Sequence, residues 1–184
     1  FIMRLLVWND GQVIEASQLR LEKPYVMQRI HTLGHKVYNV ARHIEQLREA
    51  SISLFGFASL CGPADAERII AKLLELSRVT PRLSCPVAMR IDCEGVLSFE
   101  VEAPLYDIGV AIKAKRVTGV GVEMPVFDYL RHSAASIAID SLANAMASKR
   151  GGNMPIYVNS EGNIISQPWS PIFVVFNGRV YTPV

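Results

Sequence analysis

The chain has 184 residues, of which half are apolar and a fifth are charged, and its formal net charge is +2. It is long enough to bury a sizeable core as one large domain or two small ones, which excludes a disulfide-stapled miniprotein and an intrinsically disordered chain. The nearly balanced charge also argues against a nucleic-acid-binding surface.

The cysteines and the apolar stretches restrict the compartment. Cys61, Cys85 and Cys93 are odd in number and lack the Cys-x-x-Cys spacing, so we expect reduced thiols and no metal site. No apolar stretch approaches the length of a membrane span, and no basic-then-apolar leader opens the sequence. The sequence therefore predicts a cytoplasmic protein without a membrane or nucleic-acid partner.

The first half of the chain combines strand signals with two helical patterns. Alternating and β-branched runs separated by turn signals predict strands at 3–8, 12–14, 25–32, 35–40, 87–93 and 96–102. Apolar residues at helical spacing predict a helix over 42–55 and a second helix that Asp65 caps and that ends before Pro81. Residues 1–104 are expected to form an N-terminal α/β domain.

A proline-containing segment at 105–108 is the expected linker to a second α/β domain over 109–184. The small-residue pattern over 133–150 predicts a helix, which the two glycines at 151–152 end. Short strands are expected at 109–115, 155–158, 163–166, 172–176 and 179–182.

Local motifs alone identify little chemistry, because the sequence has no glycine-rich phosphate loop, serine elbow or paired-histidine helix. Arg131 and His132 stand at the start of the predicted small-residue helix, where they either hold a phosphate or carboxylate or simply face solvent. His31 and His35 lie across a turn, so structural roles are favoured over a metal pair. The proline-bounded loop 167–171 either lines a site or only turns a corner.

Three segments in this order carry a resemblance to a known family. Residues 43–47, His-Ile-Glu-Gln-Leu, are similar to a His-x-x-Arg-Leu helix start, and residues 159–167 to an Asn-x-x-Gly-x-(Ile/Val)-(Ser/Thr)-Glu motif. Residues 170–173 resemble Ser-Asn-Ile-Phe. The chain thus resembles the fold-type IV pyridoxal-phosphate enzymes, which include branched-chain and D-amino-acid aminotransferases and 4-amino-4-deoxychorismate lyase. The resemblance implies a two-domain α/β (α+β) fold, pyridoxal phosphate as cofactor and a homodimer.

The resemblance also implies where the residues that contact the cofactor should stand. Counting back from Gly162, the family's Schiff-base lysine falls on Ser133, and a hydroxyl cannot form an imine. The family's glutamate at the pyridine nitrogen falls on Gln167, and its phosphate-binding arginine falls on Asn39. These neutral amides supply neither charge. We therefore expect that pyridoxal phosphate is not bound covalently.

Two departures concern length. The segment 22–25 is shorter than the family's glycine-rich stretch at this place, and the sequence ends at Val184, whereas family members continue. The second domain is therefore expected to be truncated, either as a partial chain or as a cut-down relative.

The leading interpretation is a degenerate relative that keeps the scaffold, has lost its cofactor chemistry and retains a pocket for an anionic small molecule between the domains. The residues expected to line this vestigial pocket are Asn39, Arg131, His132, Gln167 and Ser170.

Two alternatives remain open. One is a working aminotransferase or lyase that uses a non-standard lysine, namely Lys113, Lys115 or Lys149. The other is a structural partner within an oligomer, which the apolar content and the family's dimeric sites favour.

Overall fold

The computed structural model describes residues 2–58, 60–110, 116–125, 133–167 and 171–183. The chain divides into two compact units, unit 1 (Phe1–Lys113) and unit 2 (Ala114–Val184), which are described one at a time. The mixture of helices and strands in both units confirms the predicted α/β (α+β) class.

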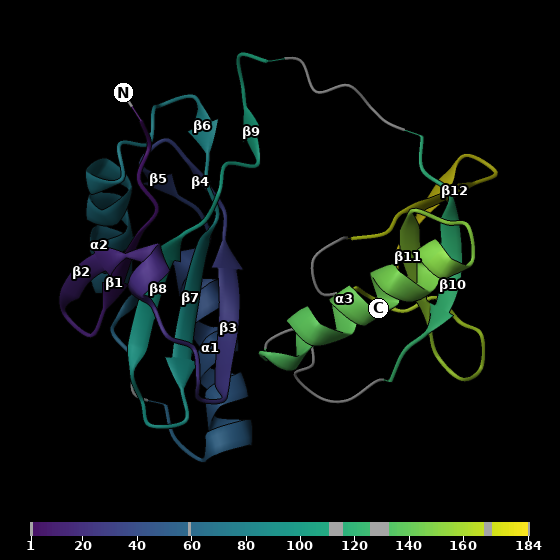
Figure 1. The fold of residues 1–184 in the computed structure, drawn as a ribbon, viewed down its shortest axis with the longest axis horizontal. Coiled ribbons are helices and arrows are strands. Elements are labelled where there is room, and N and C mark those ends of the chain that lie inside the picture. The colour runs from purple at the N-terminus through teal and green to yellow at the C-terminus, as the bar shows by residue number, and fades with distance from the viewer. Residues whose placement is uncertain (1, 59, 111–115, 126–132, 168–170, 184) are drawn as a thin grey trace. The chain divides into compact units, whose positions relative to one another are not determined.

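Unit 1 is built on a five-stranded sheet in the order β2-β1-β8-β7-β3, in which every neighbouring pair is antiparallel (Figure 1). Its strands are β1 (Leu6–Asn9), β2 (Gln12–Glu15), β3 (Tyr25–Ile30), β7 (Val87–Asp92) and β8 (Leu97–Val101), and a short 3-10 helix, η1 (Ala16–Gln18), follows β2. The predicted hairpin signals at Asp10-Gly11 and Glu94-Gly95 are confirmed as the turns of β1–β2 and β7–β8.

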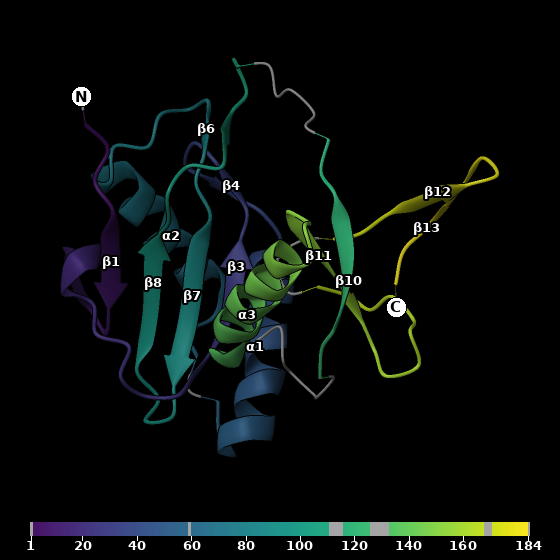
Figure 2. The same cartoon turned by 45° about the vertical axis from the view of Figure 1, so that its right-hand side comes forward.

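Two helices cover one face of this sheet (Figures 1 and 2). α1 (Val40–Phe55) packs on β3 and β7, and α2 (Pro63–Leu76) packs on β1 and β8. α2 begins two residues before the predicted cap Asp65, because Pro63 suits the first helical turn, where its missing N–H is not needed. The core between the layers includes the fully buried Leu47 and Ile70.

Two small hairpin-like pairs lie beside the main sheet. β4 (Thr32–Leu33) pairs with β5 (Lys36–Val37) through Gly34, where a Cβ atom would lie 2.8 Å from the Cα of Pro81. β6 (Leu83–Ser84) pairs with β9 (Tyr106–Asp107). The segment 105–108, expected as the linker, is therefore hydrogen-bonded into unit 1, and the division of the chain falls between Lys113 and Ala114.

Unit 2 contains a strand–helix–strand element. β10 (Gly119–Glu123) and β11 (Met154–Val158) are parallel, and α3 (Ala135–Lys149) packs on both. β10 lies outside the predicted strands, because its glycines lower the local strand signal. The packing explains Gly119: a Cβ there would lie 2.6 Å from Cδ1 of Ile156 on β11.

The remaining segments of unit 2 agree only partly with prediction. β12 (Val174–Phe176) and β13 (Arg179–Tyr181) form the predicted hairpin, and the residues of both strands are exposed. The strand expected at 163–166 is reduced to a single bridge between Val158 and Ile164. The strand expected at 109–115 lies largely outside the described residues.

A buried tyrosine joins the helix of unit 2 to its sheet. Tyr157 on β11 is fully buried among Val122, Ala143 and Ala147, and its hydroxyl donates to Oδ1 of Asp140 on α3 over 3.0 Å. Asn144 donates to the other oxygen of Asp140 over 3.1 Å. Burial, together with the hydrogen bond to Asp140, raises the pKa of the Tyr157 phenol well above its ordinary value.

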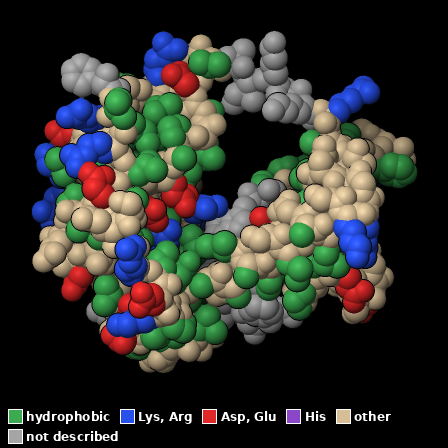
Figure 3. Space-filling model, viewed as in Figure 1, with side chains coloured by type: hydrophobic (Ala, Val, Ile, Leu, Met, Phe, Trp, Pro, Cys, Tyr) green, Lys and Arg blue, Asp and Glu red, His purple; other side chains and the backbone are tan. Residues whose placement is uncertain are grey.

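The surface has no single dominant charge on the face drawn in Figure 3, where basic and acidic side chains of unit 1 are interspersed. Unit 1 has several exposed ion pairs, such as Arg68 with Asp65 over 2.8 Å. Within the described residues, no helix has the length and apolar character that crossing a membrane requires.

The core of unit 1 gives the first prediction. Leu47→Ala removes a fully buried side chain between α1 and the sheet and should lower the free energy of unfolding of unit 1 by about 3 kcal/mol. Urea unfolding followed by Trp8 fluorescence in a Trp169→Phe background measures this loss, because Trp8 contacts Phe99 in this core. Ile52→Ala, on the same helix but half exposed, should change stability by no more than about 0.5 kcal/mol. Equal losses of unfolding free energy in Leu47→Ala and Ile52→Ala would contradict the position of Leu47 between α1 and the sheet.

The tyrosine of unit 2 gives a pH prediction. The pKa of Tyr157 in the folded state lies above the unfolded value of about 10. The phenol therefore makes its full contribution to the stability of unit 2 below about pH 10, and this contribution is lost as pH rises further. The stability advantage of the natural chain over Tyr157→Phe should therefore shrink by up to about 1.4 kcal/mol per pH unit above that value. Denaturation followed through the methyl NMR signals of Ala143 and Ala147 measures it, and parallel pH curves for the two proteins would refute it.

Candidate functional site

Ser133, the residue at the expected lysine position, stands two residues before the first residue of α3. Its backbone carbonyl accepts hydrogen bonds from the amide of Ser136 over 3.1 Å and from the Ser136 hydroxyl over 2.8 Å. Ser136 is fully buried, so these bonds fix the chain where the helix begins. Ser133 itself is half-buried and brings a hydroxyl, not an amine, to this position.

Gln167, the residue at the expected glutamate position, is 8% exposed. Its Nε2 donates to the carbonyl oxygen of Pro155 on β11 over 2.7 Å. A carboxylate has no proton for this bond at neutral pH and would place a negative charge against the carbonyl oxygen. The neutral amide is therefore matched to its own surroundings in unit 2.

Asn39, the residue at the expected arginine position, immediately precedes α1. Its backbone is left-handed, with φ 55° and ψ 30°, which asparagine tolerates better than most residues. Its carbonyl accepts from the amide of His43, while its exposed side chain makes no helix-capping bond. This residue can offer a phosphate one neutral amide but no positive charge.

His43, the first residue of the motif at 43–47, has a structural role in unit 1. Its Nδ1 donates to Oε1 of Gln28 on β3 over 3.0 Å, so it ties α1 to the sheet. Burial lowers the pKa of the imidazole, and the nearby Arg42 lowers it further. The motif histidine thus serves the packing of this helix.

Five further residues that the sequence analysis named are not among the described ones. Arg131, His132 and Ser170 lie outside the described residues, as do Lys113 and Lys115. Ser133 and Gln167 belong to unit 2, whereas Asn39 belongs to unit 1.

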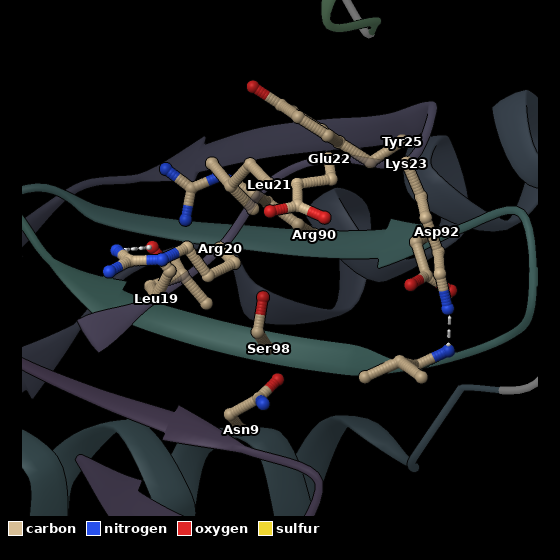
Figure 4. A pocket seen from close by; sticks show the side chains of 11 residues that line it. Asn9, Leu19, Arg20, Leu21, Glu22, Lys23, Tyr25, Arg90, Asp92 and Ser98 are labelled. Carbon is tan, nitrogen blue, oxygen red and sulfur yellow. Dashed lines mark hydrogen bonds between the residues drawn. The ribbon is translucent and has the colours of Figure 1, made fainter.

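Unit 1 holds a pocket that the sequence analysis did not identify (Figure 4). It has a volume of about 260 Å³ and lies where the segment after η1 passes β7 and β8. Its inner wall includes Tyr25, Arg90 and Ser98, and its rim includes the exposed Arg20 and Glu22. The available sequence signal was Arg90 itself, a charged residue in the middle of an otherwise buried strand.

Metal binding has no support within the described part of the chain. No group of three or more histidine, cysteine, aspartate or glutamate side chains there could hold a metal ion. Cys61, Cys85 and Cys93 are free thiols, and burial raises the pKa of Cys61 and of Cys85.

Comparison by sequence gives no relative. No protein-family model matches the chain, and no curated protein matches it.

Comparison by structure gives many similar chains, of which three aminotransferases are described here. A branched-chain aminotransferase from Thermoproteus uzoniensis, solved with norvaline, has a TM-score of 0.69 at 18% identity, with 98% of this chain and 68% of that chain covered. A fold IV transaminase from Curtobacterium pusillum has a TM-score of 0.70 at 15% identity, with 98% and 72% covered. An aminotransferase from Brucella abortus, bound to the cofactor PLP, has a TM-score of 0.72 at 14% identity, with 98% and 71% covered.

These similarities extend over nearly the whole chain, which itself spans about two thirds of the length of the solved structures. At this coverage the matched region includes both units, with the antiparallel sheet of unit 1 and the parallel pair of unit 2. The chain therefore has the fold of the fold-type IV aminotransferases.

Proposed function

We propose that this chain keeps the fold-type IV scaffold as a small-molecule-binding protein and has lost the Schiff-base chemistry of pyridoxal phosphate. The observation that carries this proposal is the hydroxyl of Ser133 at the start of α3, the place where the sequence resemblance expects a lysine. Schiff-base chemistry requires an amine, both to hold the cofactor and to move a proton afterwards.

No described lysine of unit 2 is positioned to replace Ser133. Within residues 116–125, 133–167 and 171–183, the lysine present is Lys149, in the last turn of α3. A helix of 15 residues is about 22 Å long, so Lys149 and Ser133 stand at opposite ends of it. In unit 1, Lys23 and Lys72 are already paired with Glu94 and Glu75.

The residues at the three matched positions do not fit pyridoxal phosphate. Besides the missing amine, Gln167 brings an amide that donates one of its two N–H groups to Pro155, and because it is neutral it provides no negative charge for a pyridinium nitrogen. Asn39 provides no positive charge for the phosphate. Because these positions supply three different parts of the chemistry, their joint replacement supports a lost activity more strongly than any one of them.

A binding function remains compatible with these residues. Arg131 and His132 precede Ser133 in the sequence and bring cationic character to the neighbourhood of a helix start, which favours an anionic small molecule. Asn39, Gln167 and Ser170 add neutral hydrogen-bonding groups. A homodimer in the cytoplasm completes the proposal, and the sequence resemblance supports it.

Restoring the amine tests the proposal. Ser133→Lys should become labelled at position 133 when the protein is mixed with stoichiometric pyridoxal phosphate, reduced with borohydride and analysed by peptide mass spectrometry. In the natural chain, the labelling of any single lysine should stay well below one pyridoxyl group per chain. The reason is that no amine stands at the position that the resemblance assigns to the lysine.

A matched control separates position from reactivity. Ser141→Lys adds an ammonium to the exposed part of the same helix and should not be labelled preferentially. Stoichiometric labelling of Lys113, Lys115 or Lys149 in the natural chain would overturn the proposal and establish a working enzyme with a non-standard lysine.

Gln167 gives a second prediction. Gln167→Glu should destabilise unit 2 by about 2 kcal/mol at neutral pH, because it buries a carboxylate against the Pro155 carbonyl. The pKa of the introduced carboxyl should rise above its unfolded value, so the lost stability is regained as pH falls and the acid can donate to Pro155. Unfolding followed through the Ala143 and Ala147 methyl signals at about pH 5 and about pH 8 measures this difference.

Gln167→Met is the control for this experiment. It removes the donor without adding a charge, so its stability loss should be the same at both pH values. If the stability loss of Gln167→Glu is likewise independent of pH, the buried hydrogen bond from the Gln167 amide to Pro155 is not the reason for a neutral residue at this position.

A further inference from the structure

The guanidinium of Arg90 is buried in unit 1 with part of its hydrogen-bonding capacity unused. Arg90 is 5% exposed, and its Nη2 pairs with Oε2 of Glu100 over 2.6 Å. Its Nε and Nη1 are buried and have no hydrogen-bond partner among the described residues. Buried donors without an acceptor are costly, and those of a charged group especially so.

The surroundings of Arg90 hold the side chain in place on the helix-free side of the sheet. Alternation along β7 puts Arg90 on the opposite face from Met89 and Ile91, which are buried in the core. The guanidinium carbon lies 5.8 Å from the centre of the Tyr25 ring, within the range of a cation–π contact. Arg90 is thus held by Glu100 and by the Tyr25 ring while it lines the pocket.

The pocket of Figure 4 brings other polar groups beside this guanidinium. Ser98 is opposite Arg90 in the β7–β8 register, is 4% exposed and lines the same pocket, so its hydroxyl is on the same face of the sheet as the guanidinium. Leu19, Leu21 and Val96 add apolar surface to the same cavity. All of its lining residues belong to unit 1.

The charges of the lining do not already satisfy Arg90. Asp92 Oδ1 accepts from the backbone amides of Glu94 and Val96, each over 2.9 Å, and so serves the β7–β8 turn. Lys23 is paired with Glu94 outside the lining. Arg20 and Glu22 carry opposite charges on the exposed rim. The Nε and Nη1 donors of Arg90 therefore still lack acceptor oxygens within the described part of the chain.

We propose that this pocket binds a small oxyanion, a carboxylate or a phosphate, through Nε and Nη1 of Arg90. An arginine offers five N–H donors in a planar arrangement that suits such groups, and Glu100 engages one nitrogen. The Ser98 hydroxyl supplies a further donor, and the apolar surface receives the carbon part of a carboxylate. This site goes beyond the function proposed above, since it uses none of Asn39, Ser133 and Gln167.

Titration of the full chain with defined probes, followed by the Arg90 Nε–H signal in ¹H–¹⁵N NMR spectra, tests the site. Succinate represents the carboxylate source, inorganic phosphate the phosphate source, and succinamide is a neutral control. A saturable shift of the Arg90 signal with succinate or phosphate, but not with succinamide, is expected, and the stronger of the two identifies the ligand class.

Variants assign the effect to the pocket. Arg90→Lys keeps a cation for Glu100 but lacks the guanidinium nitrogens, and should weaken binding by about tenfold or more, as followed through the Ser98 amide signal. Ser98→Ala keeps the ion pair and should weaken binding severalfold, so the test stands even if the first variant fails to fold. Arg68→Gln, which changes an exposed arginine elsewhere in unit 1, should bind as the natural chain does.

Either of two results would overturn the proposal. One is the lack of a saturable shift with both anions, which would mean that water satisfies Arg90. The other is an equal affinity in Arg90→Lys, Ser98→Ala and the natural chain. Neither result bears on the labelling of position 133, so this proposal and the proposed function can fail separately.

Discussion

The two-residue alternation of side chains along β7 and β8 is the constraint on which unit 1 depends. Met89 and Ile91 take the face covered by α1 and α2, and their burial supplies the apolar core. The same alternation forces Arg90 and Ser98 onto the other face, opposite each other in register. A polar pocket on that face is therefore a geometric consequence of the strand pattern that builds the core. Shifting either strand by one residue would move its side chains to the opposite face and destroy both the apolar core and the pocket.

Unit 2 solves a different problem, which is to hold a helix against two parallel strands with few large apolar side chains. Small residues such as Ala143 and Ala147 let α3 approach the sheet closely, and Gly119 lets β10 approach Ile156 on β11. Polar side chains then fix the arrangement: Tyr157 bonds to Asp140, and Gln167 bonds to the Pro155 carbonyl. A neutral amide at Gln167 therefore has a structural reason in this setting.

The sequence allowed the strongly patterned elements to be predicted and left the packing-dependent ones unresolved. α1 and the β7–β8 hairpin follow from clear periodicity and a Glu-Gly turn, so their local signal agrees with the fold. β10 escaped prediction because Gly119 and Gly121 are poor strand residues whose reason is the neighbouring strand. The sequence analysis did not identify Arg90 as a site residue for a similar reason. Its place in a pocket depends on its register with Ser98 and on the position of Tyr25, which local sequence does not show. Local sequence carries periodicity well, whereas the partner across a sheet is a property of the whole chain.

The proposed function requires that the scaffold persists while site residues change, and this is physically reasonable because the two depend on different parts of the chain. The motif histidine, His43, contributes to stability through its bond to Gln28, and Gln167 contributes through its bond to Pro155. Neither contribution requires a cofactor, so the proposed replacement of an amine by the Ser133 hydroxyl is compatible with an intact fold. Arg90 shows the opposite relation: Glu100 and the Tyr25 ring hold it in place, while its buried Nε and Nη1, without a partner among the described residues, reduce stability. This cost to the fold is the reason that we propose a binding role for Arg90 in addition to its place in the sheet.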